Sequence, residues 1–177
     1  MHLSHFLLVD ELLPLLRNSG GRVISVASVA HYLVNDESIF DNLLPDNSMK
    51  KGIRGSYGRA KLANILFASH LAKVEPEIFS MSLHPGAIFT PIWQFKNITM
   101  YHKIRNFFMK LCLRDPIKGC GDILFCAAHS DPKALNGGYI MNHTLVDHRY
   151  LKSKLARSDS LAEKLWTISK EAIESKL

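Results

Sequence analysis

The chain has 177 residues, enough for one domain with a buried core, and its 47% hydrophobic and 21% charged residues exclude a disordered or collagen-like protein. The net charge of +6 favours anionic partners, but the basic residues are scattered and no zinc-finger or RNA-recognition pattern accompanies them, so we expect no nucleic-acid binding. The apolar first residues lack a basic region and contain Asp10 and Glu11, and no apolar run approaches 18 residues. We therefore expect neither a signal peptide nor a transmembrane helix.

The first part of the chain predicts a helix, a strand and a loop. Apolar residues at helical intervals indicate a helix over residues 2–17, and Gly20-Gly21 is typical of the end of a helix. The β-branched run over 22–28 predicts a buried parallel strand. The Pro, Asn and Asp content of 31–55 indicates an extended loop.

The second part repeats this alternation of helix and strand. A long helix is predicted from about Ser56 to Val74, and the sequence Glu75-Pro76 stops it. Further elements follow in chain order: a strand over 78–84 closed by Pro85-Gly86, a basic aromatic amphipathic segment over 98–113, a helix over 115–129, a strand over 137–141 and a terminal helix over 158–175. Leu165 and Trp166 are expected to pack this terminal helix onto the sheet.

This order predicts an α/β fold with a parallel sheet flanked by helices. Only three strands are visible, and an open sheet of three buried strands has bare edges. The pattern therefore indicates half of a larger doubly wound domain. We treat residues 1–177 as a single partial domain.

A candidate catalytic group lies where the second helix begins. Tyr57 and Lys61 are four residues apart, so on a helix they share one face, and a nearby ammonium favours the phenolate. Ser28 at the end of a strand can present a hydroxyl to the same reacting oxygen. Ligands bind at the carboxyl ends of strands in such folds, where Ser28 and Pro85-Gly86 both fall.

The Tyr-x-x-x-Lys pattern taken alone is weak, because it arises often by chance on a solvated helix face. The order of the motifs is more specific. The segments Arg22-Val-Ile-Ser-Val-Ala-Ser28-Val-Ala-His31, Tyr57-Gly-Arg-Ala-Lys61-Leu-Ala-Asn and Ser82-Leu-His-Pro-Gly86-Ala-Ile-Phe-Thr90 follow one another as in the short-chain dehydrogenase/reductase superfamily. The chain resembles the C-terminal portion of its retinol-dehydrogenase-like branch, which includes the WW-domain oxidoreductases.

The resemblance implies an oxidoreductase that interconverts an alcohol and a carbonyl on a retinoid, steroid or other lipid-like substrate, with NAD or NADP. By resemblance Tyr57 is the general acid/base, Lys61 assists it and contacts the nicotinamide ribose, and Ser28 holds the substrate oxygen. The expected cofactor-binding residues are Tyr57, Lys61, Pro85, Gly86 and Thr90. The resemblance also implies a homodimer through the helices at 2–17 and 56–74.

The resemblance implies a partial Rossmann-type parallel sheet that lacks its N-terminal dinucleotide-binding βαβ half, because some of the family's features are missing from this sequence. The Gly-rich turn Thr-Gly-x-x-x-Gly-x-Gly, the Asn-Asn-Ala-Gly strand and the residue that selects NAD or NADP are absent, and Met1 stands where the family has a catalytic Asn. Cofactor binding by this chain alone is therefore in doubt. The alternative function is a catalytically inactive truncated isoform or fragment that acts as an interaction or dimerisation module.

Other residues favour structural interpretations. The histidines, His31 among them, lack metal-ligand spacing, so we expect loop or core histidines and no metal site. The three cysteines suit neither a metal site nor a disulfide framework and are expected to be reduced core or near-core residues of an intracellular protein, in the cytoplasm or on the cytosolic face of a membrane. The segment at about 95–113 is either a lid that contacts a lipid-like substrate and a membrane surface, or a core-covering helix.

Overall fold

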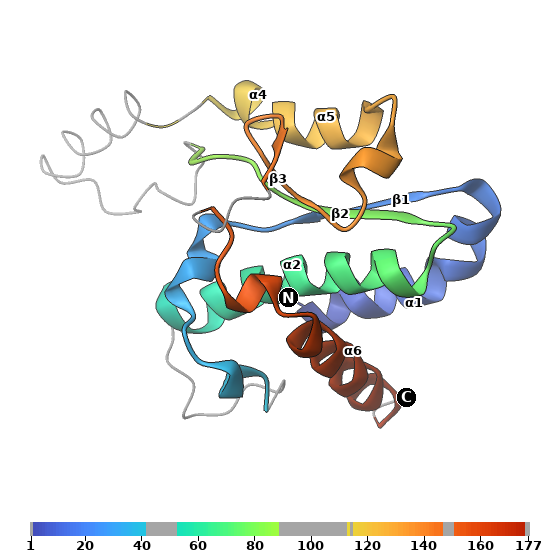
Figure 1. The fold of residues 1–177 in the computed structure, drawn as a ribbon, viewed down its shortest axis with the longest axis vertical. Coiled ribbons are helices and arrows are strands. Elements are labelled where there is room, and N and C mark those ends of the chain that lie inside the picture. The colour runs from blue at the N-terminus through green and yellow to red at the C-terminus, as the bar shows by residue number, and fades with distance from the viewer. Residues whose placement is uncertain (1, 42–52, 89–112, 114, 147–150, 176–177) are drawn as a thin grey trace, which may run out of the picture.

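The computed structural model describes residues 2–41, 53–88, 113, 115–146 and 151–175 (Figure 1). The helices are α1 (His2–Ser19), α2 (Gly58–Val74), α4 (Pro116–Gly119), α5 (Gly121–Ala128) and α6 (Asp159–Glu174). The strands are β1 (Arg22–Val26), β2 (Phe79–His84), β3 (Tyr139–Met141) and β4 (Thr144–Leu145). Short helical turns connect them: η1 (Val29–Leu33), η2 (Glu37–Phe40), η3 (Ile53–Tyr57), η5 (Pro132–Leu135) and η6 (Leu155–Arg157).

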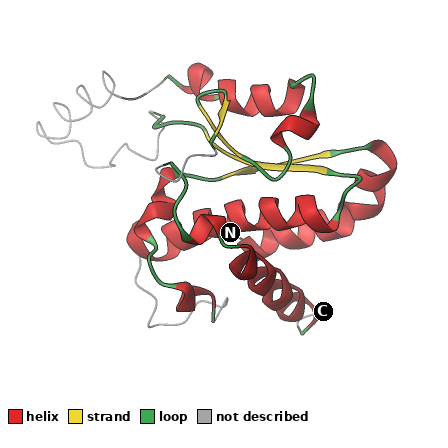
Figure 2. Cartoon of the chain, in the orientation of Figure 1, coloured by secondary structure: helices red, strands yellow, loops and turns green. Residues whose placement is uncertain are grey.

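The described elements form three layers. A four-stranded sheet lies in the middle, with α1 and α2 on one face and α4 and α5 on the other (Figures 1 and 2). The strand order is β1-β2-β3-β4, with β1 parallel to β2, β2 parallel to β3 and β3 antiparallel to β4. This is the α/β architecture that the alternation of elements predicted, a partial Rossmann-type sheet.

One strand of the sheet, β4, was not predicted from the sequence. β4 is a two-residue antiparallel strand that pairs Thr144 with Met141 and Leu145 with Ile140. Asn142 and His143 form the turn with positive φ values of 53° and 59°, which lets the chain reverse at once. The count of three strands was therefore too low, because a two-residue strand has no hydrophobic alternation to recognise.

Helix α1 ends as its glycines indicate. Gly20 has a φ of 59°, its N–H donates to the Arg17 carbonyl, and the Gly21 N–H donates to the Leu16 carbonyl at 2.9 Å. This pair of hydrogen bonds is a Schellman motif, in which glycine takes the left-handed position without a steric penalty. The prediction that Gly20-Gly21 ends the helix is confirmed.

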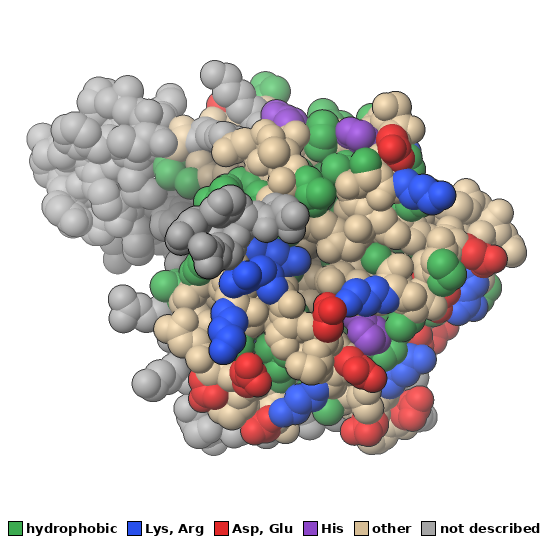
Figure 3. Space-filling model, in the orientation of Figure 1, with side chains coloured by type: hydrophobic (Ala, Val, Ile, Leu, Met, Phe, Trp, Pro, Cys, Tyr) green, Lys and Arg blue, Asp and Glu red, His purple; other side chains and the backbone are tan. Residues whose placement is uncertain are grey.

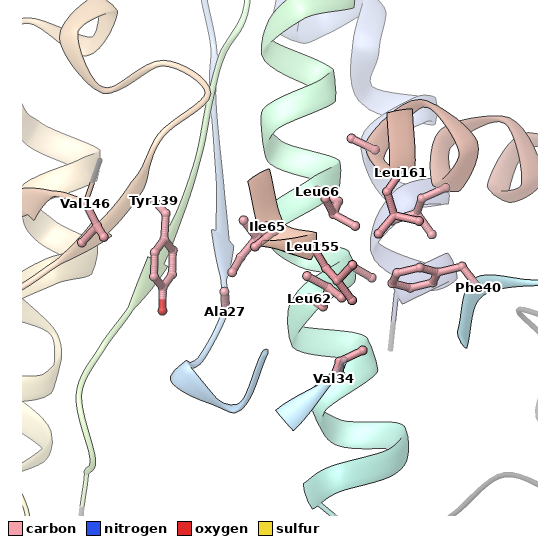
Figure 4. Close-up of a cluster of buried hydrophobic side chains, with 14 residues drawn as sticks. Ala27, Val34, Phe40, Leu62, Ile65, Leu66, Tyr139, Val146, Leu155 and Leu161 are labelled. Carbon is pink, nitrogen blue, oxygen red and sulfur yellow. The ribbon is translucent and has the colours of Figure 1, made fainter. Parts of the chain in front are cut away.

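Helix α2 is the centre of the core. Its residues from Leu62 to Ala68 are buried, so apolar neighbours surround the helix on most sides. One face packs under the sheet, and Figure 4 shows Leu62, Ile65 and Leu66 between β1 and the C-terminal segment that carries Leu155 and Leu161. The position of the candidate pair, Tyr57 and Lys61, is thus fixed by the most buried helix of the described chain.

Helix α6 packs on other helices, which corrects the expectation that it covers the sheet. Trp166 stacks on Phe67 of α2 with ring centroids 5.9 Å apart, and its edge meets Phe6 of α1 at 4.8 Å. Leu165 belongs to the cluster around α2. The C-terminal helix therefore forms an outer layer over α1 and α2 (Figure 1).

Three further expectations need correction. The predicted strand at 22–28 ends at Val26, because Ser28 caps η1 with its side chain. The predicted loop at 31–55 contains the short turns η1, η2 and η3. The predicted helix at 115–129 is two helices separated at Cys120, where Gly119 and Gly121 lower the helix propensity on both sides.

Basic and acidic side chains are interspersed on the surface seen in Figure 3. Cys126 is buried, whereas Cys120 is exposed, contrary to the expectation of a near-core residue, and Cys112 lies outside the described residues.

None of the helices that the structure describes is long and apolar enough to cross a membrane. The segment at 95–112, for which a lid was considered, also lies outside the described residues.

Candidate active site

The site lies where two neighbouring parallel strands end. Val26 of β1 pairs with Leu83 of β2, and the Ala27 N–H donates to the Leu83 carbonyl at 2.7 Å. Ser28 and the His84-Pro85 peptide therefore leave the sheet side by side. This edge is the place where open α/β sheets bind their ligands.

The hydroxyl of Ser28 accepts a hydrogen bond, and its own hydrogen stays available for donation. Its backbone is extended (φ −164°, ψ 153°), and its Oγ accepts the Ala30 N–H at 3.2 Å as the cap of η1. The side chain is buried, and it donates its hydroxyl hydrogen to none of the described residues. A hydroxyl in this state can donate to a substrate oxygen.

Tyr57 and Lys61 lie on the same side of the start of α2. Tyr57 is the last residue of η3, and its helical backbone (φ −71°, ψ −51°) leads directly into α2. The Lys61 Nζ lies 5.6 Å from the centroid of the Tyr57 ring. The Tyr57 side chain is about one third exposed, so its hydroxyl is open to a ligand while the ammonium stays beside the ring.

Lys61 joins the helix to the strand. Its Nζ donates to the Val26 carbonyl at 2.7 Å, and the Asn64 Nδ2 donates to the same oxygen at 2.9 Å. This oxygen lies two residues before Ser28, so one carbonyl fixes the distance between the helix with Tyr57 and the strand end with the serine. Burial lowers the pKa of Lys61 below its ordinary value, which is the effect of partial desolvation on an ammonium.

Asn64 is a further candidate site residue, which was not predicted from the sequence. It is buried on a helix whose neighbouring positions are apolar, and its amide meets the Val26 carbonyl. The available signal was its position three residues after Lys61, which places it on the same helix face. A buried amide must find a partner, so an Asn in an apolar helix pattern indicates a specific polar contact.

The second predicted segment follows β2. Pro85 and Gly86 are partly buried, and Gly86 has a φ of 88°, a conformation that glycine adopts without strain. The structure thus brings Ser28, Tyr57, Lys61 and the Pro85-Gly86 turn to one edge of the sheet. Thr90, the remaining predicted residue, lies outside the described residues.

These groups fit one end of a nicotinamide dinucleotide. Lys61 has three N–H donors and uses one of them on Val26, so two can reach ribose hydroxyls. The pyrophosphate end fits less well, because no strand in the described ranges leads through a Gly-rich turn into a long helix: Ser28 and the short η1 follow β1, and Pro85-Gly86 follows β2. Within the same ranges, no group of His, Cys, Asp and Glu side chains is arranged to hold a metal ion.

Curated proteins with similar sequences match nearly the whole chain. The chain is 30% identical to short-chain dehydrogenase TIC 32 A, chloroplastic, of Brassica napus, over 98% of this chain and 55% of that protein. It is 31% identical to human retinol dehydrogenase 11 (95% of this chain, 50% of the relative) and 33% identical to human retinol dehydrogenase 14 (95% and 49%). The chain spans about half the length of these relatives. No protein-family model matches it.

Solved structures give the same result for the fold. The enzyme KRED1-Pglu superposes with a TM-score of 0.51 at 26% identity, over 75% of this chain and 52% of that one. An uncharacterized protein from Mycobacterium paratuberculosis superposes with a TM-score of 0.53 at 20% identity, over 85% and 49%. Together with the ordered motifs and the partial doubly wound sheet, the relatives show that the chain is similar to part of the retinol-dehydrogenase-like proteins of the short-chain dehydrogenase/reductase superfamily.

Proposed function

We propose that the chain carries the proton-transfer site of an NAD(P)-dependent oxidoreductase that interconverts an alcohol and a carbonyl. The observation that carries this proposal is the contact of the Lys61 Nζ with the Val26 carbonyl. It places an ammonium beside the Tyr57 ring and ties both residues to the strand end that bears Ser28. Such an arrangement of a phenol, a cation and a hydroxyl suits general acid/base chemistry on an oxygen atom.

In the reduction direction the substrate carbonyl oxygen receives two hydrogen bonds, one from the Ser28 hydroxyl and one from Tyr57. NAD(P) supplies the hydride when bound, and the protein contributes position and electrostatics. Tyr57 gives its proton to the oxygen as the alcohol forms. Lys61 stabilises the phenolate that remains, since a nearby cation favours the ionised form of a phenol. The oxidation of an alcohol uses the same groups in reverse.

A lipid-like substrate is the class that we propose, because two relatives are named retinol dehydrogenases. A peripheral membrane contact would then serve delivery of the substrate. A homodimer is also part of the proposal. Leu8, Leu12 and Leu15 are exposed at positions that share one face of α1, one of the helices expected to form the dimer.

A second function, a non-catalytic interaction module, has its own support. β1 is the end strand of the described sheet, and its edge can pair with another strand. The described residues also fit only the nicotinamide end of the cofactor. In this alternative, the Lys61 contact with Val26 merely holds the helix to the strand.

A cofactor titration separates the two functions. NADH and NADPH are added to the full chain while nucleotide fluorescence is followed, and reduction of retinal is then measured by nucleotide absorbance. Lys61→Met should weaken cofactor binding, whereas Lys73→Met is the matched control, because Lys73 lies on the same helix and contacts the exposed Asp159 instead. An absence of binding at millimolar nucleotide would exclude the oxidoreductase function for this chain and favour the interaction module.

A further inference from the structure

A fully buried histidine links the end of β1 to a distant segment. The His31 Nδ1 lies 2.7 Å from the Ser28 carbonyl oxygen, and the Nε2 lies 3.2 Å from the backbone nitrogen of Ser153, 122 residues later in the chain. The His31 N–H also donates to the Ser28 carbonyl at 3.1 Å. One side chain thus joins the strand end that carries the proposed catalytic hydroxyl to the segment before η6.

The partners of the ring determine its protonation state. A carbonyl oxygen can only accept a hydrogen bond, so Nδ1 carries a hydrogen; a peptide N–H can only donate, so Nε2 carries none. The ring is therefore neutral in its Nδ1–H form. A protonated ring would direct a second N–H at the Ser153 N–H, and that contact would be lost.

Aromatic side chains and positive charges surround the ring. Tyr32 lies against it with centroids 4.5 Å apart, and Tyr139 of β3 meets it edge-on at 5.4 Å. In Figure 4 the hydroxyl of Tyr139 is directed toward the end of β1, where Ala27 lies. Within the described part of the chain, the further titratable groups that act on His31 are His84 from β2 and Lys152 from the C-terminal segment.

This environment disfavours the imidazolium. Burial lowers the pKa of His31 below its ordinary value; the hydrogen bond to Ser28 opposes this effect, and the neighbouring Lys152 and His84 add to it. The ring therefore remains neutral at and below neutral pH. The link between Ser28 and Ser153 is therefore maintained in the pH range in which an oxidoreductase of this type would work.

We infer that His31 is a positioning residue for Ser28: in its neutral Nδ1–H form it clamps the Ser28 carbonyl to the Ser153 amide and so fixes the direction of the Ser28 hydroxyl. The inference deepens the proposed function and rests on it for the role of Ser28. The clamp acts on the backbone of Ser28, while its hydroxyl oxygen accepts the Ala30 N–H. Without the clamp, the turn at η1 is free to rotate the hydroxyl away from the substrate oxygen.

The test uses nuclear magnetic resonance of the full, ¹⁵N-labelled chain. Long-range ring correlations should show the Nδ1–H form for His31 at pH 7. As the pH falls, the amide signals of Ala30 and Ser153 should shift together with the ring signals, at a midpoint below 6.5. An Nε2–H form, or amide shifts that are independent of the ring, would overturn the inference.

Two variants supply a second readout. His31→Phe keeps an aromatic ring but offers neither a donor nor an acceptor, and His31→Gln can supply both. In His31→Phe the Ser153 amide should exchange about fivefold faster, because it loses its hydrogen bond to the ring, worth roughly 1 kcal/mol. The Ala30 amide should also exchange faster, because the turn that holds its hydrogen bond to the Ser28 Oγ is no longer clamped. His31→Gln should restore most of this protection, and Leu66 in α2 should exchange at the wild-type rate in both variants. Unchanged exchange of Ala30 in His31→Phe contradicts the clamp.

The result does not depend on catalysis. If the chain fails to bind nucleotide, the ring state and the exchange of Ala30 still decide whether the clamp exists. If His31→Phe does not fold, the titration of the wild type and the His31→Gln variant decide it. Ser28→Ala, which removes the proposed catalytic hydroxyl, should leave the His31 ring in its Nδ1–H form; a changed form shows that the contact depends on the side chain and not on the carbonyl.

Discussion

The buried His2 should make the stability of the chain depend on pH. Its Nε2 lies 2.8 Å from the Ser169 Oγ, and that hydroxyl donates to the Leu165 carbonyl at 2.6 Å. Because the hydroxyl hydrogen is used, Ser169 accepts from His2, and the ring is neutral with its hydrogen on Nε2. Phe6 and Phe67 enclose the ring at 6.0 and 6.1 Å.

The magnitude follows from the pKa. Burial, together with nearby positive charges, lowers the pKa of His2 from 6.5 to about 4. At about 1.36 kcal/mol per pKa unit, this corresponds to roughly 3 kcal/mol of folding free energy. Between these pH values the unfolded chain binds a proton at His2 and the folded chain does not. The stabilisation by the neutral His2 ring is therefore fully present above pH 6.5 and is lost as the pH falls to about 4.

Urea unfolding at pH 7 and pH 4, followed by circular dichroism, measures this effect. The His2→Gln variant is the control, because its amide can donate to Ser169 and does not titrate. The wild type should lose about 3 kcal/mol more than His2→Gln between the two pH values, since carboxylates such as Glu75 contribute equally to both proteins. Equal losses within about 0.5 kcal/mol would refute the buried neutral state of His2.

Three further perturbations have defined outcomes. Leu66→Ala should lower the free energy of unfolding by about 2–5 kcal/mol, because the side chain is fully buried in the core, as urea unfolding can measure. Gly20→Ala should cost about 1 kcal/mol in the same assay, since its φ of 59° strains any residue with a Cβ; no loss would contradict the Schellman motif. Burial raises the pKa of Cys126 to about 11, so mass-mapped thiol labelling at pH 7 should modify Cys120 and reach Cys126 only after denaturation; rapid native labelling of Cys126 would contradict its burial.

The sequence predicted the elements that have long, regular patterns. α2 has a helical apolar repeat and ends before Pro76, and β2 is a buried run closed by Pro85, so both elements could be located from local signals. The contact of Trp166 with Phe67 joins residues about one hundred positions apart. No local pattern specifies such a partner, so α6 was assigned to the wrong neighbour.

The candidate site was predictable only in part, because local patterns locate its residues and do not specify their partners. The spacing of Tyr57 and Lys61 and the ends of two strands place the main groups at one edge of the sheet. The acceptor of Lys61 is a backbone carbonyl, and every residue has one, so the sequence could not identify Val26. His31 was described as a loop or core histidine, and only the fold reveals that Ser153 is its second partner.

The turnover of the Tyr57→Phe variant tests the central claim most directly. The change removes one hydroxyl from a partly exposed side chain, so folding and cofactor affinity should remain close to those of the unaltered chain. Retinal reduction with NADH and NADPH is measured for both proteins at saturating nucleotide. The account predicts that the unaltered chain reduces the aldehyde and that Tyr57→Phe does not. Reduction at an undiminished rate by the variant would contradict the role of the phenol in proton transfer.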